Sequence, residues 1–244
     1  MRVHRFCRTA LPLIGLVLPR PLFAQFSPDT TKSAAYNAAS SIFYAKMQPE
    51  AHLYDGVEFL PYDNIIHGNA FYPDGSVHTG TVTYDGIWYG SVPMLYDILK
   101  DQLIISTSAD YLISPAQGKI GGFAFGDHRF VRLQPDSATE GFPGTGIYEI
   151  LYEGRERLLV RHRKAVQIDP SDQHQFYLEK TAYYLLAGGK YYTVDRQRTF
   201  LKALGNAQST LKGFIRRNGL RFKTDPPGTM KAVLAYYDQM NPRS

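Results

Sequence analysis

Cysteine is almost absent from this sequence. The only one among 244 residues is Cys7, which lies in an N-terminal segment that we expect to be removed. Without Cys7 the remaining chain can form no disulfide, no thiolate metal site and no cysteine nucleophile. Tryptophan occurs once, and no apolar run reaches the roughly 20 residues that a membrane-spanning helix needs. We therefore expect no transmembrane segment in the mature chain.

The first 24 residues predict a secretory signal peptide, with a short anchor that stays attached as the alternative. Arg2, Arg5 and Arg8 form a basic start, residues 9–19 are mostly apolar, and Ala24 supplies the small residue before the expected cleavage. Removing this segment takes four of the 27 Lys and Arg residues, which leaves 23 basic against 22 acidic side chains. That near balance argues against nucleic-acid binding. The protein is expected to be exported, to the periplasm or outside the cell.

The mature chain divides by composition into a leader and one domain. Residues 25–50 are rich in Ala, Ser and Thr and predict a weak helix or a disordered leader. Residues 51–194 alternate between strand-like runs, one of them at 123–133, and turn pairs such as Asp85-Gly86, Glu153-Gly154 and Gly188-Gly189. Such pairs supply the positive φ of two-residue hairpin turns. This part of the chain therefore predicts an antiparallel meander.

The hydrophobic period becomes helical after residue 199. Leu211 and Ile215 lie four apart before Gly219, and Asp225 followed by two prolines signals a second helix start. The sequence thus predicts an α+β fold, mostly β, in which 51–244 form a single domain with two C-terminal helices packed on the meander. Ten side chains are expected in the core: Val82, Trp88, Leu95, Ile104, Phe130, Leu151, Leu158, Leu185, Phe214 and Leu234.

Several segments carry a resemblance to known proteins. They include Leu53-Tyr54-Asp55-Gly56-Val57-Glu58-Phe59, Gly126-Asp127-His128-Arg129-Phe130-Val131 and Gly146-Ile147-Tyr148-Glu149-Ile150-Leu151-Tyr152-Glu153-Gly154. Over roughly 50–240 the chain resembles a family of exported, uncharacterised proteins of Bacteroidota. The resemblance implies export and a single domain, and it brings no catalytic residue with it.

The usual catalytic and metal-binding motifs are missing. The sequence contains no Gly-x-Ser-x-Gly elbow and no His-x-x-x-His, and we predict neither a cofactor nor a metal site. A turn explains Asp74 to His78 better than a metal site does, and His128 is expected to be structural. Carboxylates lie close in sequence in three places, Asp55 with Glu58, Asp97 with Asp101 and Glu149 with Glu153, as a glycosidase would require of two acids across a cleft.

Charge is distributed unevenly along the chain. Residues 25–150 carry 6 basic and 14 acidic side chains, whereas residues 151–244 carry 17 basic and 8 acidic ones. Within the basic half, Arg155, Arg157, Arg161 and Arg163 share parity, so they would project from one face of a strand while Leu158 and Val160 face the other way. These four arginines are the candidate anion-binding residues. The alternative is that the acidic and basic halves fold against each other and cancel.

These features favour a secreted or periplasmic, non-enzymatic binding or accessory protein of the cell envelope. Its partner would be an anionic envelope component or another envelope protein. The alternative function is an envelope hydrolase that acts on glycan or peptide through a carboxylate pair or a serine.

Overall fold

The computed structural model describes residues 52–62, 65–107, 111–135 and 139–240. The expected signal peptide at 1–24 and leader at 25–50 lie outside these residues. Within them, no helix has the length and apolar character that crossing a membrane requires.

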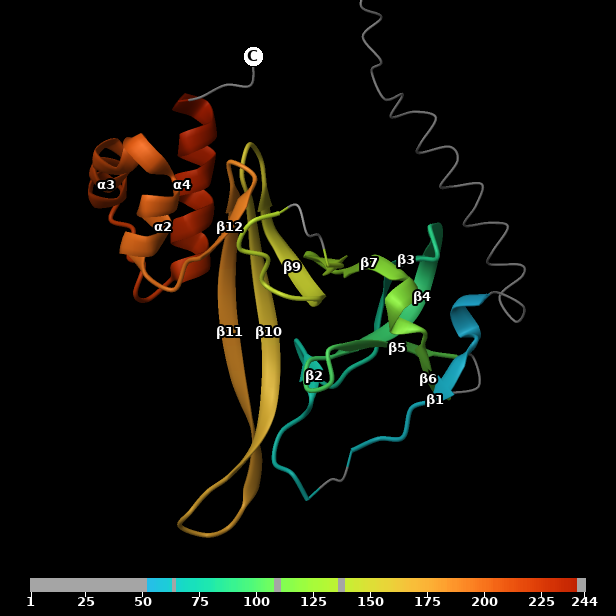
Figure 1. Cartoon of the computed structure of the whole chain (residues 1–244). Helices are drawn as coiled ribbons and strands as arrows, with labels where there is room; N and C mark the ends of the chain where they lie inside the picture. The colour runs from blue at the N-terminus through green and yellow to red at the C-terminus, as the bar shows by residue number, and fades with distance from the viewer. Residues whose placement is uncertain (1–51, 63–64, 108–110, 136–138, 241–244) are drawn as a thin grey trace, which may run out of the picture.

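Twelve strands form one antiparallel sheet (Figure 1). Its spatial order is β1-β6-β5-β4-β3-β7-β8-β9-β10-β11-β12, and β2 pairs with β4 beside this path. Every named strand pair is antiparallel and most neighbours are consecutive in sequence, which confirms the predicted meander. The strands are β1 Gly56–Glu58, β2 Phe71–Tyr72, β3 His78–Tyr84, β4 Ile87–Asp97, β5 Gln102–Ser106, β6 Leu112–Pro115, β7 Ile120–Phe125, β8 His128–Leu133, β9 Gly146–Glu153, β10 Arg157–Ile168, β11 Gln175–Ala187 and β12 Lys190–Thr193.

Turn chemistry decides where several strands end. Asp85 and Gly86 have φ values of 52° and 77° between β3 and β4, and Gly188 with Gly189 makes the same left-handed turn between β11 and β12. These two of the three predicted two-residue hairpins are therefore confirmed. The single strand expected over 123–133 is wrong, because Gly126 has a φ of 52° and turns the chain between β7 and β8. The Glu153-Gly154 turn is also wrong as a two-residue hairpin, since three residues connect β9 to β10.

Three helices cover one end of the sheet. They are α2 Gln197–Ala203, α3 Gln208–Arg217 and α4 Pro226–Met240; short 3-10 turns lie at η2 His52–Tyr54, η3 Gln117–Lys119 and η4 Gly205–Ala207. The two predicted C-terminal helices correspond to α3 and α4, and α2 is an additional one. Figure 1 shows all three beside β9–β12, away from β1–β7. Gly219 follows α3 with a φ of 63°, as a helix-ending glycine does.

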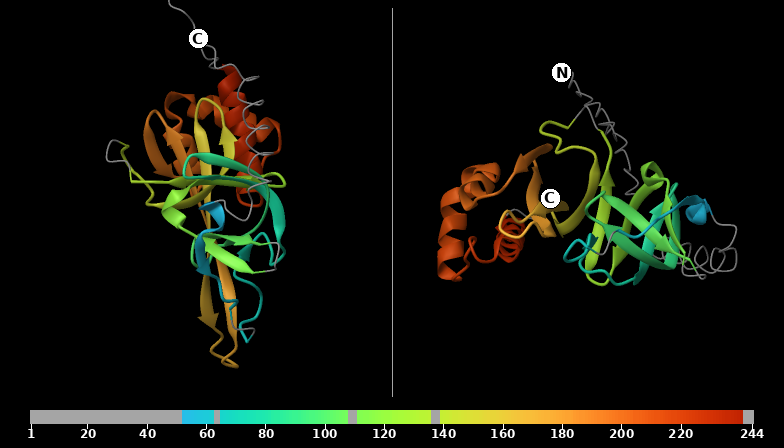
Figure 2. Two further views of the ribbon diagram at one scale, coloured as in Figure 1. Left: turned by 90° about the vertical axis from the view of Figure 1, so that its right-hand side faces the viewer. Right: turned by 90° about the horizontal axis from the view of Figure 1, so that it is seen from below.

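Two main hydrophobic clusters hold the fold together. The first lies within the curved half of the sheet (Figure 2). Met94, Ile105 and Phe123 are buried there. The second joins the strands to the helices, through Leu158 and Leu185 on one side and buried side chains such as Phe200 and Leu234 on the other. The predicted docking of helices on the meander is confirmed, because burial of these apolar side chains stabilises it.

Seven of the ten predicted core side chains are buried. Trp88, Leu151 and Phe214 are only partly buried, so the expectation for these three is wrong. Leu151 shows the cause for one of them. In the pairing of β9 with β10, Tyr152 lies opposite Leu158 and Ile150 lies opposite Leu159, which leaves Leu151 as an extra residue. This β-bulge reverses the inward and outward alternation along β9.

Candidate functional site: a basic pocket on the sheet

The predicted arginine row lies mainly on β10. Its register with β11 runs without interruption from Arg157 opposite Leu186 to Ile168 opposite Gln175. Alternate residues therefore share a face, which places Arg157, Arg161 and Arg163 together and buried Leu158 on the face that meets the helices. Arg155 precedes the strand, so the prediction that it belongs to the row is wrong.

Arg161 is buried and bound to the acidic half of the chain. One guanidinium nitrogen, Nη2, donates to Asp101 Oδ2 at 2.8 Å and to the Thr145 carbonyl at 2.9 Å. The other, Nη1, donates to the Tyr148 hydroxyl at 3.0 Å, and the guanidinium carbon lies 5.0 Å from the centre of that ring. Burial alone would lower the pKa of Arg161, but Asp101 raises it above the ordinary value.

Glycine makes room for this guanidinium. A Cβ atom on Gly146, at the start of β9, would lie 2.1 Å from Arg161 Nη2 and 2.5 Å from Asp101 Oδ2. The φ of Gly146 is 154°, which side chains rarely adopt. The ion pair therefore depends on glycine at this position as well as on its own two side chains.

Arg157 is also paired. Its guanidinium and that of Arg129 both bind the carboxylate of Glu153 at the sheet surface. The bulge at Leu151 explains this arrangement, because it turns Glu153 to the same face as Arg157 while Glu149 stays on the helix side. Arg157 thus has a carboxylate partner of its own.

Arg163 differs from the other members of the row. It is exposed, and Lys180 of β11 lies directly opposite it. Neither cation has a hydrogen bond or a carboxylate partner within the part of the chain that the structure describes. Like charges that face each other across two strands repel. No carboxylate of the described residues therefore neutralises the two positive charges of this pair.

A pocket of about 690 Å³ opens beside this pair. Arg161, Arg163, Lys180, Tyr184 and Pro143 line it, and we call it the basic pocket. Tyr184 is half-buried and packs edge-on against Tyr148, with ring centres 5.7 Å apart. Arg161 contributes one further feature, since its Nε atom is buried and has no hydrogen-bond acceptor in the described part of the chain. The pocket thus combines positive charge, one unused buried donor and an aromatic surface.

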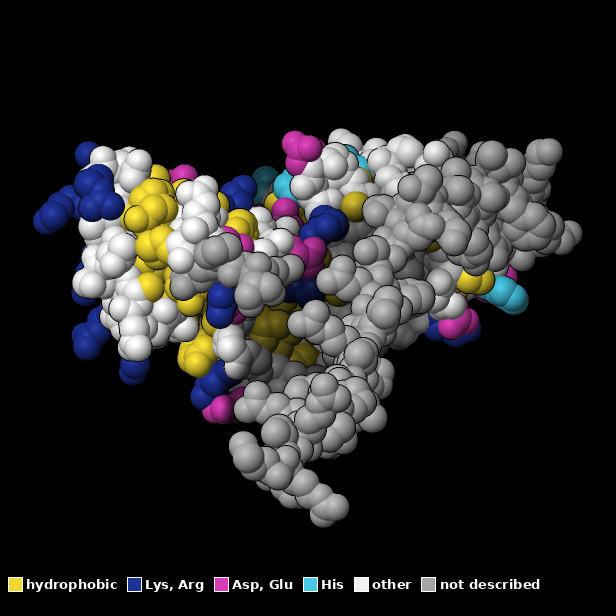
Figure 3. All heavy atoms as spheres, turned by 90° about the horizontal axis from the view of Figure 1, so that it is seen from above, with side chains coloured by type: hydrophobic (Ala, Val, Ile, Leu, Met, Phe, Trp, Pro, Cys, Tyr) yellow, Lys and Arg dark blue, Asp and Glu magenta, His cyan; other side chains and the backbone are white. Residues whose placement is uncertain are grey.

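Part of the charge asymmetry is internal. The pairs Asp101 with Arg161 and Glu140 with Lys190 each join the acidic half of the chain to the basic half. Other cations stay at the surface, and Figure 3 shows Lys and Arg side chains around the helical end. The exposed ones on and after α3 include Lys212, Arg216, Arg217, Arg221 and Lys223.

The two carboxylates of each predicted pair have different surroundings. Asp97 is buried and accepts hydrogen bonds from Tyr62 and Gln102, whereas Asp101 binds Arg161. Glu149 and Glu153 diverge at the bulge. Asp55 contacts His52 at the surface, and Glu58 is exposed on β1. The hydrogen bonds therefore show none of these three carboxylate pairs as two acids that face each other.

Asp74 Oδ1 lies 3.3 Å from His78 Nε2, and Asp74 also accepts the Ser76 backbone N–H. A turn accounts for this segment. Among the described residues, no group of three or more His, Cys, Asp or Glu is arranged to hold a metal ion.

Sequence reasoning missed Lys180 and Tyr184. Their signal lies in the pairing of β10 with β11, which places Lys180 opposite Arg163 and Tyr184 opposite Leu159. The loop between the two strands spans residues 169–174, and no rule for two-residue turns fixes a register across it. The strand pairing itself was required to find them.

Comparisons with protein-family models, with curated proteins and with solved structures find no match to this chain. The site is therefore interpreted from its own residues.

Proposed function

We propose that this protein is an exported binding protein of the cell envelope that takes an anionic ligand in the basic pocket. The observation that carries the proposal is the pair of facing cations, Arg163 and Lys180, for which the described residues offer no carboxylate partner. An anion placed between them would relieve their mutual repulsion and form charge-assisted hydrogen bonds. Arg157 and Arg161 contribute less directly, because each already binds a carboxylate.

The pocket suits a small anionic group attached to a larger molecule. Its volume of about 690 Å³ lies within the range of small-molecule sites, and Tyr184 with Pro143 offers apolar surface next to the cations. Tyrosine rings are well suited to contact sugars and other partly polar groups. A phosphate or carboxylate carried by an envelope glycan or lipid has this combination of charge and surface.

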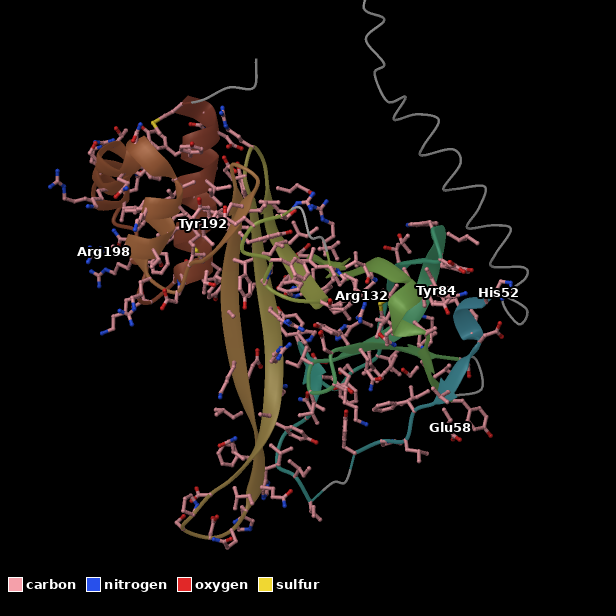
Figure 4. All side chains as sticks on the ribbon, in the orientation of Figure 1. His52, Glu58, Tyr84, Arg132, Tyr192 and Arg198 are labelled. Carbon is pink, nitrogen blue, oxygen red and sulfur yellow. The ribbon has the colours of Figure 1, made fainter. Side chains whose placement is uncertain are left out.

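A binding measurement tests the proposal. The double variant Arg163→Gln, Lys180→Gln should bind purified lipopolysaccharide about 100-fold more weakly, because each of the two lost charge-assisted contacts is worth about tenfold in affinity. Arg198→Gln is the matched control, since Arg198 is an exposed cation on the outer side of the helices (Figure 4). Dephosphorylated lipopolysaccharide and polygalacturonate distinguish phosphate from carboxylate recognition.

Binding by the wild type should also weaken steeply with salt, because exposed charges are screened. Equal affinity of the double variant and Arg198→Gln would contradict the assignment of the ligand to this pocket. Both variants should keep the stability of the wild type, since exposed charges contribute about 0–1 kcal/mol.

Export is the second part of the proposal. It is supported by the basic start, the short apolar stretch and the Ala24-Gln25 junction, together with the resemblance to exported Bacteroidota proteins. Intact-mass measurement of the protein from the envelope fraction should show the loss of the first 24 residues. Recovery of the full-length chain from the cytosol would refute it.

A further inference from the structure

A second pocket, of about 320 Å³, lies on the helix side of β10. Residues alternate along the strand, so His162 faces this pocket while Arg161 and Arg163 face the basic pocket. His128 of β8, Glu149 of β9 and His162 line it from the sheet, and Lys231 of α4 lines it from the helix. We call it the His–Glu pocket.

Glu149 lies at the centre of this cluster and is buried. Its Oε1 is 2.6 Å from His128 Nδ1, and its Oε2 is 2.7 Å from His162 Nε2. Burial alone would raise the pKa of Glu149, but the hydrogen bonds with His162 and His128 lower it below the ordinary value. The carboxylate is therefore ionised at neutral pH.

The ionised carboxylate fixes the protons of both imidazoles. An ionised carboxylate only accepts hydrogen bonds, so the ring nitrogen that faces it must carry the proton. A neutral His128 is then protonated on Nδ1 and has its lone pair on Nε2. A neutral His162 is protonated on Nε2 and has its lone pair on Nδ1.

The two histidines differ in access. His162 Nδ1 is buried, has no hydrogen-bond partner among the described residues and lies 3.8 Å from Glu179. The His162 ring stacks on Tyr72 with centres 4.0 Å apart. The His128 side chain, in contrast, is 33% exposed. His128 can therefore accept a proton from a bound molecule, while His162 holds Glu149 in place.

Tyr72 completes the wall of the pocket. Its hydroxyl lies 3.4 Å from both Glu149 Oε2 and His128 Nδ1. Burial, and then the charge of Glu149, raise the pKa of Tyr72 well above its ordinary range, so this hydroxyl remains protonated. The carboxylate is thus surrounded by donors, and its hydrogen bonds with His162 and His128 outweigh the opposing effect of burial.

We propose that the His–Glu pocket hydrolyses small carboxylic esters, with His128 as general base and Glu149 as the positioning residue that fixes its tautomer. A carboxylate that orients an imidazole in this way is a recurring arrangement in acyl-transfer enzymes. A glycosidase is a poorer fit, because it needs a protonated carboxylic acid to protonate the glycosidic oxygen, and Glu149 is held ionised. The proposal does not rest on anion binding in the basic pocket.

The reaction balances with water as the only co-reactant. His128 Nε2 removes a proton from water as the water oxygen bonds to the acyl carbon, and the carbonyl electron pair moves to oxygen. Lys231, the cation of the pocket, stabilises that oxyanion. The carbon–oxygen bond to the alcohol then breaks, the alkoxide takes the proton from His128, and a carboxylic acid and an alcohol are released.

Hydrolysis of p-nitrophenyl acetate by the purified mature chain tests this proposal. The wild type should show saturable hydrolysis, and His128→Gln should lower kcat/KM about 100-fold, the usual contribution of a general base. His174→Gln is the matched control, because His174 is exposed near the far tip of the β10–β11 hairpin and reports the hydrolysis that any surface imidazole causes. His128→Asn serves as the second variant if His128→Gln does not fold.

Glu149→Gln separates positioning from a merely structural role. The amide can donate to His128 Nδ1, which moves the imidazole proton to Nε2 and removes the base. We expect a loss of about 100-fold together with a change of the His128 tautomer in ¹⁵N NMR spectra. An unchanged tautomer, or equal rates for wild type and folded His128 variants, would overturn the proposal. So would an equal loss in His174→Gln. Lipopolysaccharide binding should be unaffected in His128→Gln, which distinguishes this test from that of the basic pocket.

Discussion

Replacing Arg161 with Met is expected to lower the free energy of unfolding by about 3–5 kcal/mol, the usual cost of removing one partner from a buried ion pair. Methionine matches much of the arginine stem but carries no charge. Asp101 would be left as a largely buried carboxylate without its cation, and the Tyr148 hydroxyl would lose a donor. Denaturant unfolding followed by circular dichroism measures the change.

The matched control is Arg163→Met, on the same face of the same strand. Arg163 is exposed and has no carboxylate partner among the described residues, so this variant should stay within about 0.5 kcal/mol of the wild type. The double variant Arg161→Met, Asp101→Asn should recover part of the loss, because it removes the unpaired charge. Equal stability of Arg161→Met and Arg163→Met would show that the pair is not buried in solution.

Leu158→Ala should destabilise the protein by about 2–5 kcal/mol, the usual range for a fully buried leucine. Leu158 is 0% exposed and lies in the cluster that joins the sheet to the three helices. Truncation leaves a cavity between β10 and the helices, whose apolar side chains cannot all close it. A thermal or denaturant melt of the purified protein gives the value.

Leu151→Ala provides the comparison, because Leu151 lies at the β-bulge and is only partly buried. Its cost should fall below the range for Leu158, since fewer atoms leave a packed environment. If Leu151→Ala proved as costly as Leu158→Ala, the bulge would not be where the structure places it.

These two predictions concern residues with different tasks in one strand. Arg161 and Leu158 stabilise opposite faces of β10, while Arg163 remains available to a ligand. Arg161 and Arg163 share one face of β10, yet Arg161 is buried and Arg163 is exposed. Asp101, from the acidic half of the chain, binds Arg161, and this ion pair gives Arg161 a structural role.

Local sequence patterns predicted the parts of the fold that depend on near neighbours. Asp85-Gly86 and Gly188-Gly189 make hairpins because a tight turn requires positive φ, whatever lies around it. Met230, Val233 and Leu234 form a buried helix face because their spacing aligns them on one side of α4. Trp88 and Phe214 were misjudged because the degree of burial depends on which distant element covers a side chain.

By itself, therefore, the sequence determined the antiparallel meander, the positions of α3 and α4 and the uneven distribution of charge. Only the tertiary structure decided which charges are paired and which are free. Lys180 meets Arg163, and Glu149 meets His128 and His162, through strand register and a one-residue bulge. The physical reason is that side-chain alternation in a sheet has a period of two, so one extra residue exchanges the faces, and nothing within a few residues of Leu151 specifies that shift.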